Sequence, residues 1–442
     1  MKRPQPAVQV EPDLQRFSRV TLETALAEVP GYASWRDFDP GPQAPVDERY
    51  AALPVLTKDT LRHHFPSGFT PRGKNLRQGL FTGEVEFAQT SGSTDDQVTL
   101  VFDSRWWEAS ERSAWQLNSL ARQLTSGSPR EAVLASPRCV GPGYADEPLS
   151  VAERTIGRHL YLNEKINPAS WTVEDIERMA EEMNGFAPLL LEADPAYLAP
   201  FARRIGARGI KIVQPRLIFL TYSYPSRIYL RQIHRIFAAP LASSYGSTET
   251  GHVFMECEAG RLHQNTAHNR VDFQPWLPRF GGPLRGRMLV SVLHNPWFVA
   301  LRFDIGDVAR VDERGPCPCG RNDGMILAAI EGRIKDVLLT PDGRALTVDD
   351  LDAVLAEVKE LNGWQLDLAD SRSACLRLLA EPAGAEKVGR HAREQLRSIC
   401  GPGVEIETSL EKSLKHESSG KFRFVRAAFP VNHEFLWTTQ RK

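Results

Sequence analysis

The stretch Tyr245-Gly246-Ser247-Thr248-Glu249-Thr250-Gly251 decides how the rest of the chain is interpreted. It directly follows Leu241–Ser244, which is predicted to be a short buried strand. The aromatic ring offers a face for a flat base, the glycines let the backbone approach a ligand closely, and the carboxylate binds a hard cation such as Mg²⁺. Taken alone, a Gly-Ser-Thr segment after a strand is more often an ordinary turn. Its meaning therefore depends on the motifs that accompany it.

Composition sets the broad class of the protein. A chain of 442 residues exceeds one ordinary core and predicts two or three domains. The 54 basic and 55 acidic residues give a net charge of −1, which excludes an overall field directed at nucleic acid or an anionic membrane. No apolar run is long enough to span a bilayer, and the N-terminal residues lack the apolar core of a signal peptide. Six cysteines in so long a chain predict no disulfide framework, so we expect a cytoplasmic protein.

A second hydroxyl-rich loop lies between two predicted strands. Thr90-Ser91-Gly92-Ser93-Thr94 follows Val85–Ala88 and precedes Thr99–Phe102. Strand, small polar loop and strand form an arrangement in which backbone N–H groups and hydroxyls can surround phosphate oxygens. The loop lacks the lysine of the usual nucleotide loop, and by itself it is as typical of a solvated hairpin tip. Residues 1–50 are rich in proline and are predicted to form an N-terminal arm with a short helix near Leu14–Leu26.

The middle of the chain alternates between short apolar runs and helical patterns. The apolar runs include Ala132–Ala135, Lys211–Val213 and Leu217–Leu220, and helices are predicted near 173–183, 228–238 and within 107–124. This alternation predicts βαβ units and a mostly parallel sheet covered by helices. Ligands bind such sheets where strand ends give way to loops, which is where the stretch from Tyr245 to Gly251 stands.

The C-terminal part is predicted to be a separate α/β unit. Arg287–Leu293 and Ala300–Phe303 have strand patterns, and a domain boundary is expected near 333–336. From 349 the pattern restarts with a helix (349–359), a strand (373–380), a second helix (385–399) and a second strand (404–409). We therefore expect an α/β protein with a large domain (51–333) of mixed and parallel sheets and a small mobile C-terminal domain (336–442).

Four separated motifs in one fixed order are far more specific than any one of them. They are TSGST (90–94), YGSTE (245–249), FDIGD with EGRIKD (303–307 and 331–336), and SSGK (418–421). Their order resembles the adenylate-forming superfamily of acyl-CoA ligases and adenylation domains, over residues 50–430. The chain length, the Cys-Pro-Cys-Gly at 317–320 and the last motif resemble the phenylacetate-CoA ligase branch.

The resemblance implies a role for each motif. The loop residues Ser91, Gly92, Ser93 and Thr94 would grip the β- and γ-phosphates of ATP. Thr90, Gly246 and Ser247 would also belong to the ATP-binding site. Tyr245 would pack by the adenine, while Asp307 would bind the ribose hydroxyls close to Arg333. Further residues would take part in catalysis or substrate binding. These are Thr248 at the α-phosphate, Glu249 on Mg²⁺, Lys421 bridging the carboxylate and the α-phosphate, Lys335 at the hinge, and Tyr222, Ser223 and Tyr224 near the substrate.

These roles fit the chemistry of carboxylate activation. A carboxylate that attacks the α-phosphate brings two anions together, so cations are needed where negative charge develops. The ammonium group of Lys421 and an Mg²⁺ ion on Glu249 would supply them. A small domain turning about Lys335 would then withdraw Lys421 and admit a second nucleophile. Each of these residues, taken singly, is also typical of a solvated surface.

Several positions depart from the family pattern. The phosphate loop continues as Asp95-Asp96-Gln97, where the family usually has glycine and a basic residue. Carboxylates there would repel phosphate unless they face water or a metal. Residues 221–225 replace the usual small residue and glutamate, and 339–344 lacks the glycine that lines the pantetheine tunnel in acyl-CoA ligases. Adenylation is therefore better supported than transfer to CoA.

Three cysteines and a histidine form a candidate metal site. Cys257 and His263 are followed by Cys317 and Cys319, and a reducing compartment favours their use as a tetrahedral Zn²⁺ site over disulfides. His252 and His268 are alternatives to His263, and a metal-free Cys-Pro-Cys turn is the other interpretation. Some relatives in the phenylacetate-CoA ligase branch carry zinc at similar positions.

The sequence leaves three functions open. The first is an ATP-dependent ligase that forms an acyl-adenylate and passes the acyl group to CoA, with an aromatic acid as a mild favourite because residues 219–245 are rich in aromatic side chains. The second has the same adenylate chemistry with another acceptor: an amine, a carrier protein, a phosphorylated cofactor or an inorganic nucleophile. The third is a non-catalytic nucleotide-binding protein. A homodimer is expected only from the resemblance.

Overall fold

The chain folds into two compact units. A computed structural model describes residues 12–90, 97–125, 127–144, 147–370, 372–382, 384–429 and 433–438. Unit 1 consists of Met1–Thr125, Ser244–Pro278 and Gly282–Ile330, and unit 2 of Ser126–Ser243, Arg279–Gly281 and Glu331–Lys442. Among the described helices, none combines the length and the apolar content that crossing a lipid bilayer requires.

Unit 1 combines N-terminal helices with an antiparallel sheet. Its strands follow the order β11-β12-β13-β14-β10-β9-β8, and a separate hairpin pairs β1 with β2. The helices are α1 (Pro12–Glu28), α2 (Val46–Ala52), α3 (Lys58–His64), α4 (Leu76–Phe81), α5 (Ser104–Trp115) and α6 (Ser119–Thr125). The strands are β1 (Glu86–Gln89), β2 (Thr99–Phe102), β8 (Leu241–Ser247), β9 (Gly251–Glu256), β10 (Leu262–Gln264), β11 (Asn269–Pro275), β12 (Arg285–Val292), β13 (Phe303–Val311) and β14 (Ile326–Arg333).

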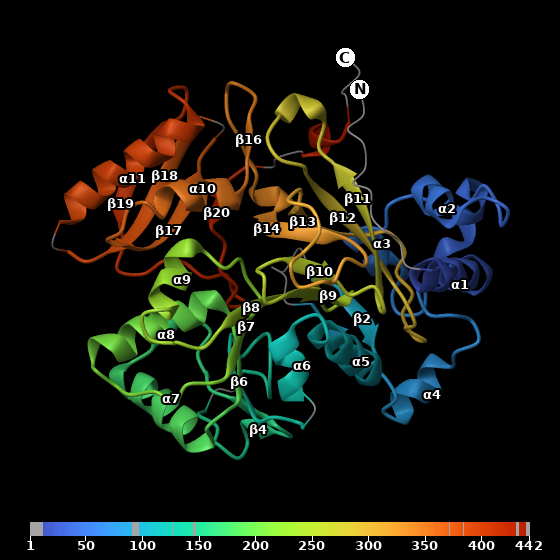
Figure 1. Cartoon of the computed structure of the whole chain (residues 1–442), viewed down its shortest axis with the longest axis horizontal. Helices are drawn as coiled ribbons and strands as arrows, with labels where there is room; N and C mark the ends of the chain where they lie inside the picture. The colour runs from blue at the N-terminus through green and yellow to red at the C-terminus, as the bar shows by residue number, and fades with distance from the viewer. Residues whose placement is uncertain are drawn as a thin grey trace. The chain divides into compact units, whose positions relative to one another are not determined.

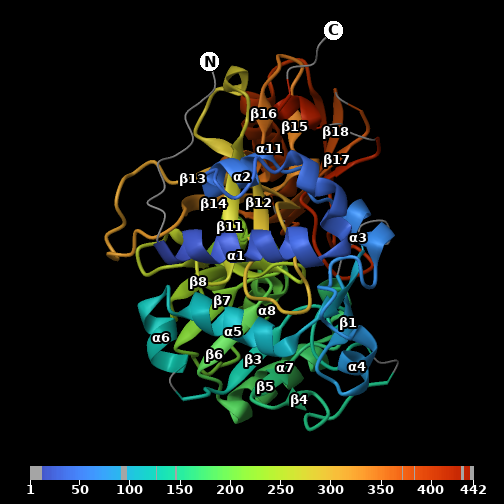
Figure 2. The same ribbon diagram turned by 90° about the vertical axis from the view of Figure 1, so that its right-hand side faces the viewer.

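The N-terminal helices pack into the core of unit 1. Leu22, Tyr32 and Tyr50 are completely buried in one apolar cluster with side chains of the sheet, such as Phe254 and Met288. The hydroxyl of Tyr32 donates to the carbonyl of Val299 at 3.0 Å, so its burial leaves no polar atom unsatisfied. Figure 2 shows α1 running across the strands β11 and β12. Residues 12–50 are therefore part of the folded body of unit 1.

Unit 2 contains a parallel sheet and a second, smaller sheet. The parallel strands are ordered β8-β7-β6-β3-β5, with β4 antiparallel at the edge, and the smaller sheet has the order β19-β18-β17-β20. The helices are α7 (Val173–Phe186), α8 (Pro195–Ala207), α9 (Arg227–Ile233), α10 (Val348–Leu355) and α11 (Ala385–Cys400). The strands are β3 (Glu131–Leu134), β4 (Thr155–Ile156), β5 (His159–Tyr161), β6 (Leu190–Ala193), β7 (Leu217–Leu220), β15 (Leu338–Leu339), β16 (Ala345–Leu346), β17 (Leu361–Leu368), β18 (Ser373–Ala380), β19 (Glu405–Leu410) and β20 (Val425–Ala427).

The predicted βαβ organisation is confirmed in unit 2. Helix α7 connects β5 to β6 and α8 connects β6 to β7, and both helices lie beside these strands in Figure 1. Strand β8 begins in unit 2, where residues 241–243 pair with β7, and ends in unit 1, where residues 244–247 pair with β9. The YGSTE motif thus lies at the carboxyl end of a strand, as the sequence predicted.

Three local predictions were wrong, each for an identifiable reason. Residues 211–213 form no strand, because the amide of Asn184 hydrogen-bonds the backbone of both Lys211 and Val213. The strand predicted at 300–303 begins only at Phe303, since Arg302 has a positive φ of 49°. The helix predicted within 107–124 is two helices, because the side chain of Asn118 accepts bonds from the first N–H groups of α6.

Candidate functional site

The YGSTE motif forms a tight turn between β8 and β9. The N–H of Thr250 donates to the carbonyl of Ser247 at 3.0 Å. A Cβ on Gly246 would lie 2.0 Å from the carbonyl oxygen of Gly251, and Gly251 itself has a φ of 66°. Both glycines are therefore required by the close approach of the two strands. The turn places Thr248, which is half-buried, and Glu249 at the end of the hairpin.

Two residues predicted to bind the nucleoside lie in contact. The hydroxyl of Tyr245, on β8, donates to Oδ2 of Asp307, on β13, at 2.8 Å. Both side chains are half-buried. An aromatic ring held beside a carboxylate matches what a nucleoside needs, because the ring faces the base and the carboxylate accepts from the ribose hydroxyls. The residues were brought together by the fold from positions far apart in the sequence.

Glu249 is a buried carboxylate whose charge is met by one lysine. Its side chain is 3% exposed, and Oε1 lies 3.4 Å from Nζ of Lys58, at the start of α3. This pair lacks hydrogen-bond geometry, so Oε1 of Glu249 is a buried acceptor without a hydrogen bond. Buried carboxylates of this kind are stabilised by a cation. The observation fits the predicted Mg²⁺ ligand.

The predicted phosphate loop is described only at its ends. Thr90 is buried, and its Oγ1 accepts from the N–H of Val98 at 3.0 Å while its own N–H donates to the carbonyl of Val98. These bonds close the base of the loop between β1 and β2. Ser91, Gly92, Ser93 and Thr94 lie outside the described residues. In the second motif, Oγ of Ser247 lies 3.0 Å from Oγ1 of Thr250.

In unit 2, the loop that carries Lys421 is held by the residues that follow β3 and β6. The hydroxyl of Ser136 donates to the carbonyl of Ser419 at 2.6 Å, and that of Tyr197 donates to the carbonyl of Gly420 at 3.1 Å. Gly420 has a φ of 85°, and a Cβ there would meet Oγ of Ser136 at 2.3 Å. The glycine of the SSGK motif is thus required where the loop touches the body of unit 2.

A buried carboxyl group lies near Lys421. Asp194 caps the start of α8 through the N–H of Ala196 and accepts from the hydroxyl of Ser223 at 2.5 Å. Burial raises the pKa of Asp194 to about 6, while the bonds from Ser223 and Ala196 and the charge of Lys421 act in the opposite direction. Ser223, predicted to lie near the substrate, therefore contacts a group that interacts electrostatically with the predicted catalytic lysine.

The other predicted residues of unit 2 are spread over two places. Tyr222 has a φ of 70° and its hydroxyl contacts Glu192, whereas the hydroxyl of Tyr224 donates to Asp349 at 2.7 Å. Arg333 is half-buried at the end of β14, and Lys335 is exposed in the single turn that follows.

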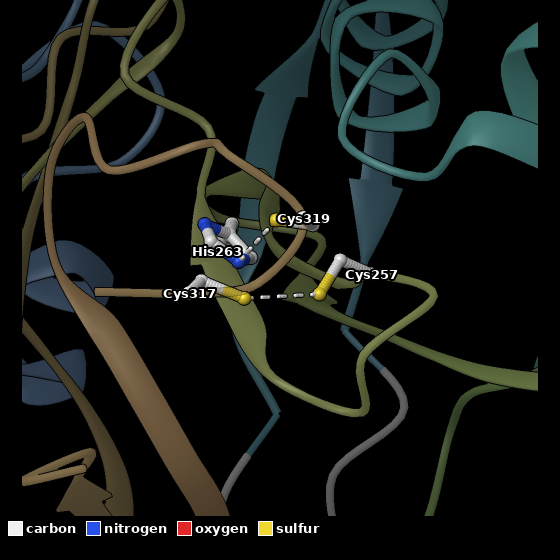
Figure 3. Close-up of side chains that lie close together, drawn as sticks. All are labelled: Cys257, His263, Cys317 and Cys319. Carbon is white, nitrogen blue, oxygen red and sulfur yellow. Dashed lines mark hydrogen bonds between the residues drawn. The ribbon is translucent and has the colours of Figure 1, made fainter. Parts of the chain in front are cut away.

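The four predicted zinc ligands converge in unit 1. Cys257 follows β9, His263 lies on β10, and the two other cysteines lie in the loop between β13 and β14. The Sγ atoms of Cys257 and Cys317 are 3.7 Å apart, and Sγ of Cys319 is 3.4 Å from Nε2 of His263 (Figure 3). All four ligand atoms lie within 4.8 Å of one another. Tetrahedral Zn²⁺, with bonds of about 2.3 Å to sulfur and about 2.0 Å to nitrogen, would separate its ligands by roughly 3.4–3.8 Å.

The chemistry of this cluster also fits a metal. Burial raises the pKa of the Cys257 thiol to about 12, so a cation is needed to make it a thiolate at neutral pH. Of the three histidines considered, His263 is the one in the cluster. His252 instead contacts Ser244 and the ring of Trp107. His268 packs against Trp106.

Sequence reasoning missed several residues of the site. It assigned no role to Lys58, Ser136, Asp194 or Tyr197, which the fold brings to Glu249 or to the Lys421 loop. One signal was available for Lys58: the phosphate loop lacks a basic residue, so a cation from another segment is required. Ser136 directly follows the predicted strand 132–135, where ligand-binding residues of open sheets lie. Asp194 and Tyr197 follow β6, a strand that was not predicted from the sequence.

Comparison with known proteins rests on structure alone. No protein-family model matches the chain, and no curated protein matches its sequence. The structure of 2-hydroxyisobutyryl-CoA ligase in the postadenylation state, in complex with 2-HIB-AMP, matches with a TM-score of 0.70 and 14% identity, over 98% of this chain and 95% of that chain. The same ligase in the thioesterification state matches with a TM-score of 0.55 and 16% identity, over 94% and 89%.

The structure of a second ligase is similar to a smaller part of this chain. The anthranilate CoA ligase AuaEII, in complex with anthranoyl-AMP, matches with a TM-score of 0.50 and 12% identity, over 77% of this chain and 65% of that chain. The predicted fold class is therefore confirmed. The chain has the fold of the CoA ligases whose structures contain acyl-adenylates.

Proposed function

We propose that this protein is an ATP-dependent carboxylate-activating ligase that forms an acyl-adenylate with release of pyrophosphate and then passes the acyl group to CoA. One observation carries the proposal: Tyr245 on β8 contacts Asp307 on β13, and β8 leads directly to the buried carboxylate Glu249. A base-facing ring, a ribose-binding carboxylate and a metal-binding carboxylate are three of the groups that Mg-ATP requires. The two neighbours named above are CoA ligases, and the structures of both contain an acyl-AMP.

Different residues of the chain would have different roles in the first step, the formation of the acyl-adenylate. A carboxylate oxygen of the acid forms a bond to the α-phosphorus of ATP, the bond to the β-phosphate oxygen breaks, and pyrophosphate leaves. Thr248 would bind the α-phosphate, and the ammonium of Lys421 would stabilise the negative charge that develops between acid and phosphate. Mg²⁺ on Glu249 would neutralise the phosphates.

Lys421 would act only in the first step, in which the adenylate forms, and the second step would not need it. The thiolate of CoA attacks the acyl carbon, the bond from that carbon to the phosphate oxygen breaks, and AMP leaves. We propose that residues 336–442 move as a small domain about Lys335, which is exposed in the turn after β14. The bonds from Ser136 and Tyr197 to the Lys421 loop would then be the contacts that break.

We also propose a structural role for a zinc ion on Cys257, His263, Cys317 and Cys319. The ligands join the β9–β10 hairpin to the loop before β14, and both segments belong to the sheet that carries Tyr245 and Asp307. All four positions would be filled by protein ligands, which is typical of a structural site. The ion would hold the sheet and take no part in the reaction.

A screen of carboxylic acids tests the proposed function. The purified chain is incubated with Mg-ATP and single acids, and pyrophosphate release is measured with and without CoA, with acyl-AMP and acyl-CoA identified by mass spectrometry. We expect pyrophosphate release that depends on the acid and acyl-CoA when CoA is present. Acyl-AMP without acyl-CoA would instead favour an amine, a carrier protein or another acceptor. ATP binding without pyrophosphate release for any acid would identify a non-catalytic nucleotide-binding protein.

Replacement of Asp307 tests the nucleoside site. In Asp307→Ala we expect the KM for ATP to rise by about 10- to 100-fold, because charge-assisted hydrogen bonds to the ribose are lost. The KM for the acid should stay the same. The matched control is Asp37→Ala, which removes an exposed carboxylate of unit 1. Equal KM values for ATP in the two variants would exclude Asp307 from the nucleotide site.

A further inference from the structure

A cavity of unit 2 lies next to the loop that carries Lys421. It has a volume of about 680 Å³ and is bounded by the ends of β3 and β5, residues 137–144 and 147–149, and the segment from 163 to the first turns of α7. Sites for small organic molecules usually have volumes of roughly 300–1,000 Å³. None of the residues that the sequence assigned to a site lines it.

Two separate contacts join the cavity wall to the Lys421 loop. Ala135 and Pro137 line the cavity, and Ser136 between them donates to the carbonyl of Ser419 at 2.6 Å. Tyr197 reaches both sides, since its hydroxyl contacts the carbonyl of Ile166, in the wall, and lies 3.1 Å from the carbonyl of Gly420. The wall of the cavity therefore adjoins the loop that carries Lys421.

The strongest positive charges of the cavity are already neutralised. Arg154 is almost completely buried and forms a paired contact with Glu182, with Nη1 at 2.9 Å and Nη2 at 2.5 Å. Arg178 bonds to Glu182 at 2.9 Å and to Glu164 at 3.0 Å. Buried guanidinium groups with two carboxylate partners do not attract a further anion strongly. The cavity thus offers no arginine for a second carboxylate of a substrate.

The remaining charged groups of the cavity also disfavour a ligand with a second negative charge. Lys165 is paired with Asp175 at 2.9 Å, and the rim carries the exposed carboxylates Glu147 and Glu174. These carboxylates repel a ligand with an additional negative charge. Between the charged groups the wall is apolar, with Val140, Pro142, Tyr144, Pro148, Leu149 and Ile166.

We propose that this cavity binds the non-carboxylate part of the acid, and that the acid is a monocarboxylate whose remaining part is uncharged, bulky and mostly apolar. This inference rests on the proposed function. The carboxylate would point to Lys421 and the apolar part would fill the volume behind Ser136. The paired arginines and the carboxylates of the rim exclude dicarboxylic acids. An amino acid is disfavoured for a different reason, because its ammonium group would lie against the apolar wall and lose water.

A change of cavity volume tests this proposal. Val140, half-buried in the wall, is replaced by tryptophan, and the KM for the best acid is expected to rise by about tenfold or more while the KM for ATP stays the same. Val20→Trp, at an exposed position of α1, is the matched control. Val140→Ala, which enlarges the cavity, should shift the preference to bulkier acids and remains informative if the tryptophan variant does not fold.

The outcomes separate this inference from the proposed function. The acid panel contains aromatic and branched aliphatic monocarboxylates, dicarboxylates and amino acids. If the unmodified chain releases pyrophosphate but prefers a dicarboxylate or an amino acid, or if both Val140 variants behave as Val20→Trp does, the cavity proposal is wrong and the proposed function stands. If no acid supports pyrophosphate release, both are wrong.

A different observation concerns the missing cation of the phosphate loop. The loop continues with Asp95 and Asp96 and contains no basic residue. Helix α3 contacts the residue that follows this segment, because Nε of Arg62 donates to the carbonyl of Gln97 at 2.9 Å. The start of the same helix brings Nζ of Lys58 to 3.4 Å from Oε1 of Glu249. One short helix therefore contacts both Gln97, at the start of the described chain after the loop, and the predicted Mg²⁺ ligand.

Three hydrogen bonds hold the backbone just before Lys58 and at the start of α3. The N–H of Leu56 donates to the carbonyl of Arg302 at 3.1 Å, and its carbonyl accepts from the N–H of Asp304 at 2.9 Å. Thr57 caps α3 by accepting from the N–H of Thr60 at 3.3 Å. Lys58 is thereby held against the first residues of β13, the strand that also carries Asp307. A cation placed in this way needs little reorganisation to meet a ligand.

We infer that Lys58 binds the ATP phosphates in place of a basic residue of the loop. This too rests on the proposed function. In the absence of nucleotide the ammonium neutralises Glu249. Phosphate oxygens that share an Mg²⁺ ion with Glu249 lie within a few ångströms of it, so the same ammonium reaches them.

Paired variants of Lys58 test this role. In Lys58→Ala we expect the KM for ATP at saturating Mg²⁺ to rise by about tenfold or more, and Lys58→Arg should restore most of the loss. Arg77→Ala removes an exposed cation of α4 and is the control. If Lys58 only neutralises Glu249, Lys58→Ala will bind Mg²⁺ more tightly with an unchanged KM for ATP, and that result would overturn the inference. Pyrophosphate release with any acid by the unmodified chain separates a failure of this inference from a failure of the proposed function.

Discussion

Lys421→Ala is expected to lower the rate of acid-dependent pyrophosphate release by about 100- to 1,000-fold, because one preorganised charge at a reacting phosphate contributes a factor of this size. The structure supports this expectation through the loop that carries the lysine. Its carbonyl groups at Ser419 and Gly420 are held by Ser136 and Tyr197, so the position of Lys421 in unit 2 is determined by more than its own side chain.

The two half-reactions distinguish catalysis from folding. Lys421→Ala should still convert a synthetic acyl-AMP and CoA into acyl-CoA at a rate close to that of the unmodified chain, since the lysine acts only in adenylation. Lys412→Ala, an exposed lysine of the same region, is the matched control for both measurements. Equal loss of both half-reactions would show a folding defect, and full adenylation by the variant would exclude Lys421 as the catalytic cation.

Loss of the zinc site is expected to have the second largest effect. Cys317→Ser should abolish the bound zinc, which we expect at one ion per chain, and lower the thermal unfolding midpoint by about 10 °C. The reason is that Cys317 is buried and 3.7 Å from Cys257, so removing one ligand leaves buried groups without their common partner. Elemental analysis and thermal unfolding measure the two quantities, and a strong chelator should reproduce the shift in the unmodified chain.

A cysteine outside the cluster provides the comparison. Cys375 lies on β18 in unit 2 and is free. Cys375→Ser should keep the zinc and the unfolding midpoint of the unmodified chain. A protein that contains no zinc after preparation without chelators, or one whose midpoint is the same in both variants, would contradict the metal site.

Much of the site could be predicted because its residues lie in motifs of fixed order. Tyr245 and Asp307 were each assigned a nucleoside contact from sequence, and the fold brings them to 2.8 Å. The zinc ligands were predicted by residue type, but sequence left three histidines open. The pairing of β9 with β10, which sets His263 opposite Met255 and turns at Cys257, decides between them.

The rest depends on contacts between distant segments. Lys58 and Glu249 lie in different segments of unit 1, far apart in the sequence, and no local pattern links them. Residues 211–213 have the composition of a strand, but the amide of Asn184, on α7, takes their backbone hydrogen bonds. In both cases a contact between distant segments determines the local structure or the site, and the propensities of the local sequence give no sign of that contact.

The most direct test of the central claim follows the oxygen of the acid. The chain is supplied with Mg-ATP, CoA and an accepted acid whose carboxylate carries heavy oxygen, and the AMP produced is analysed by mass spectrometry. If the carboxylate attacks the α-phosphorus, the bridging oxygen remains on phosphorus when the acyl group leaves, so AMP carries one heavy oxygen. Formation of ADP, or of AMP without the heavy isotope, would contradict the acyl-adenylate on which this account depends.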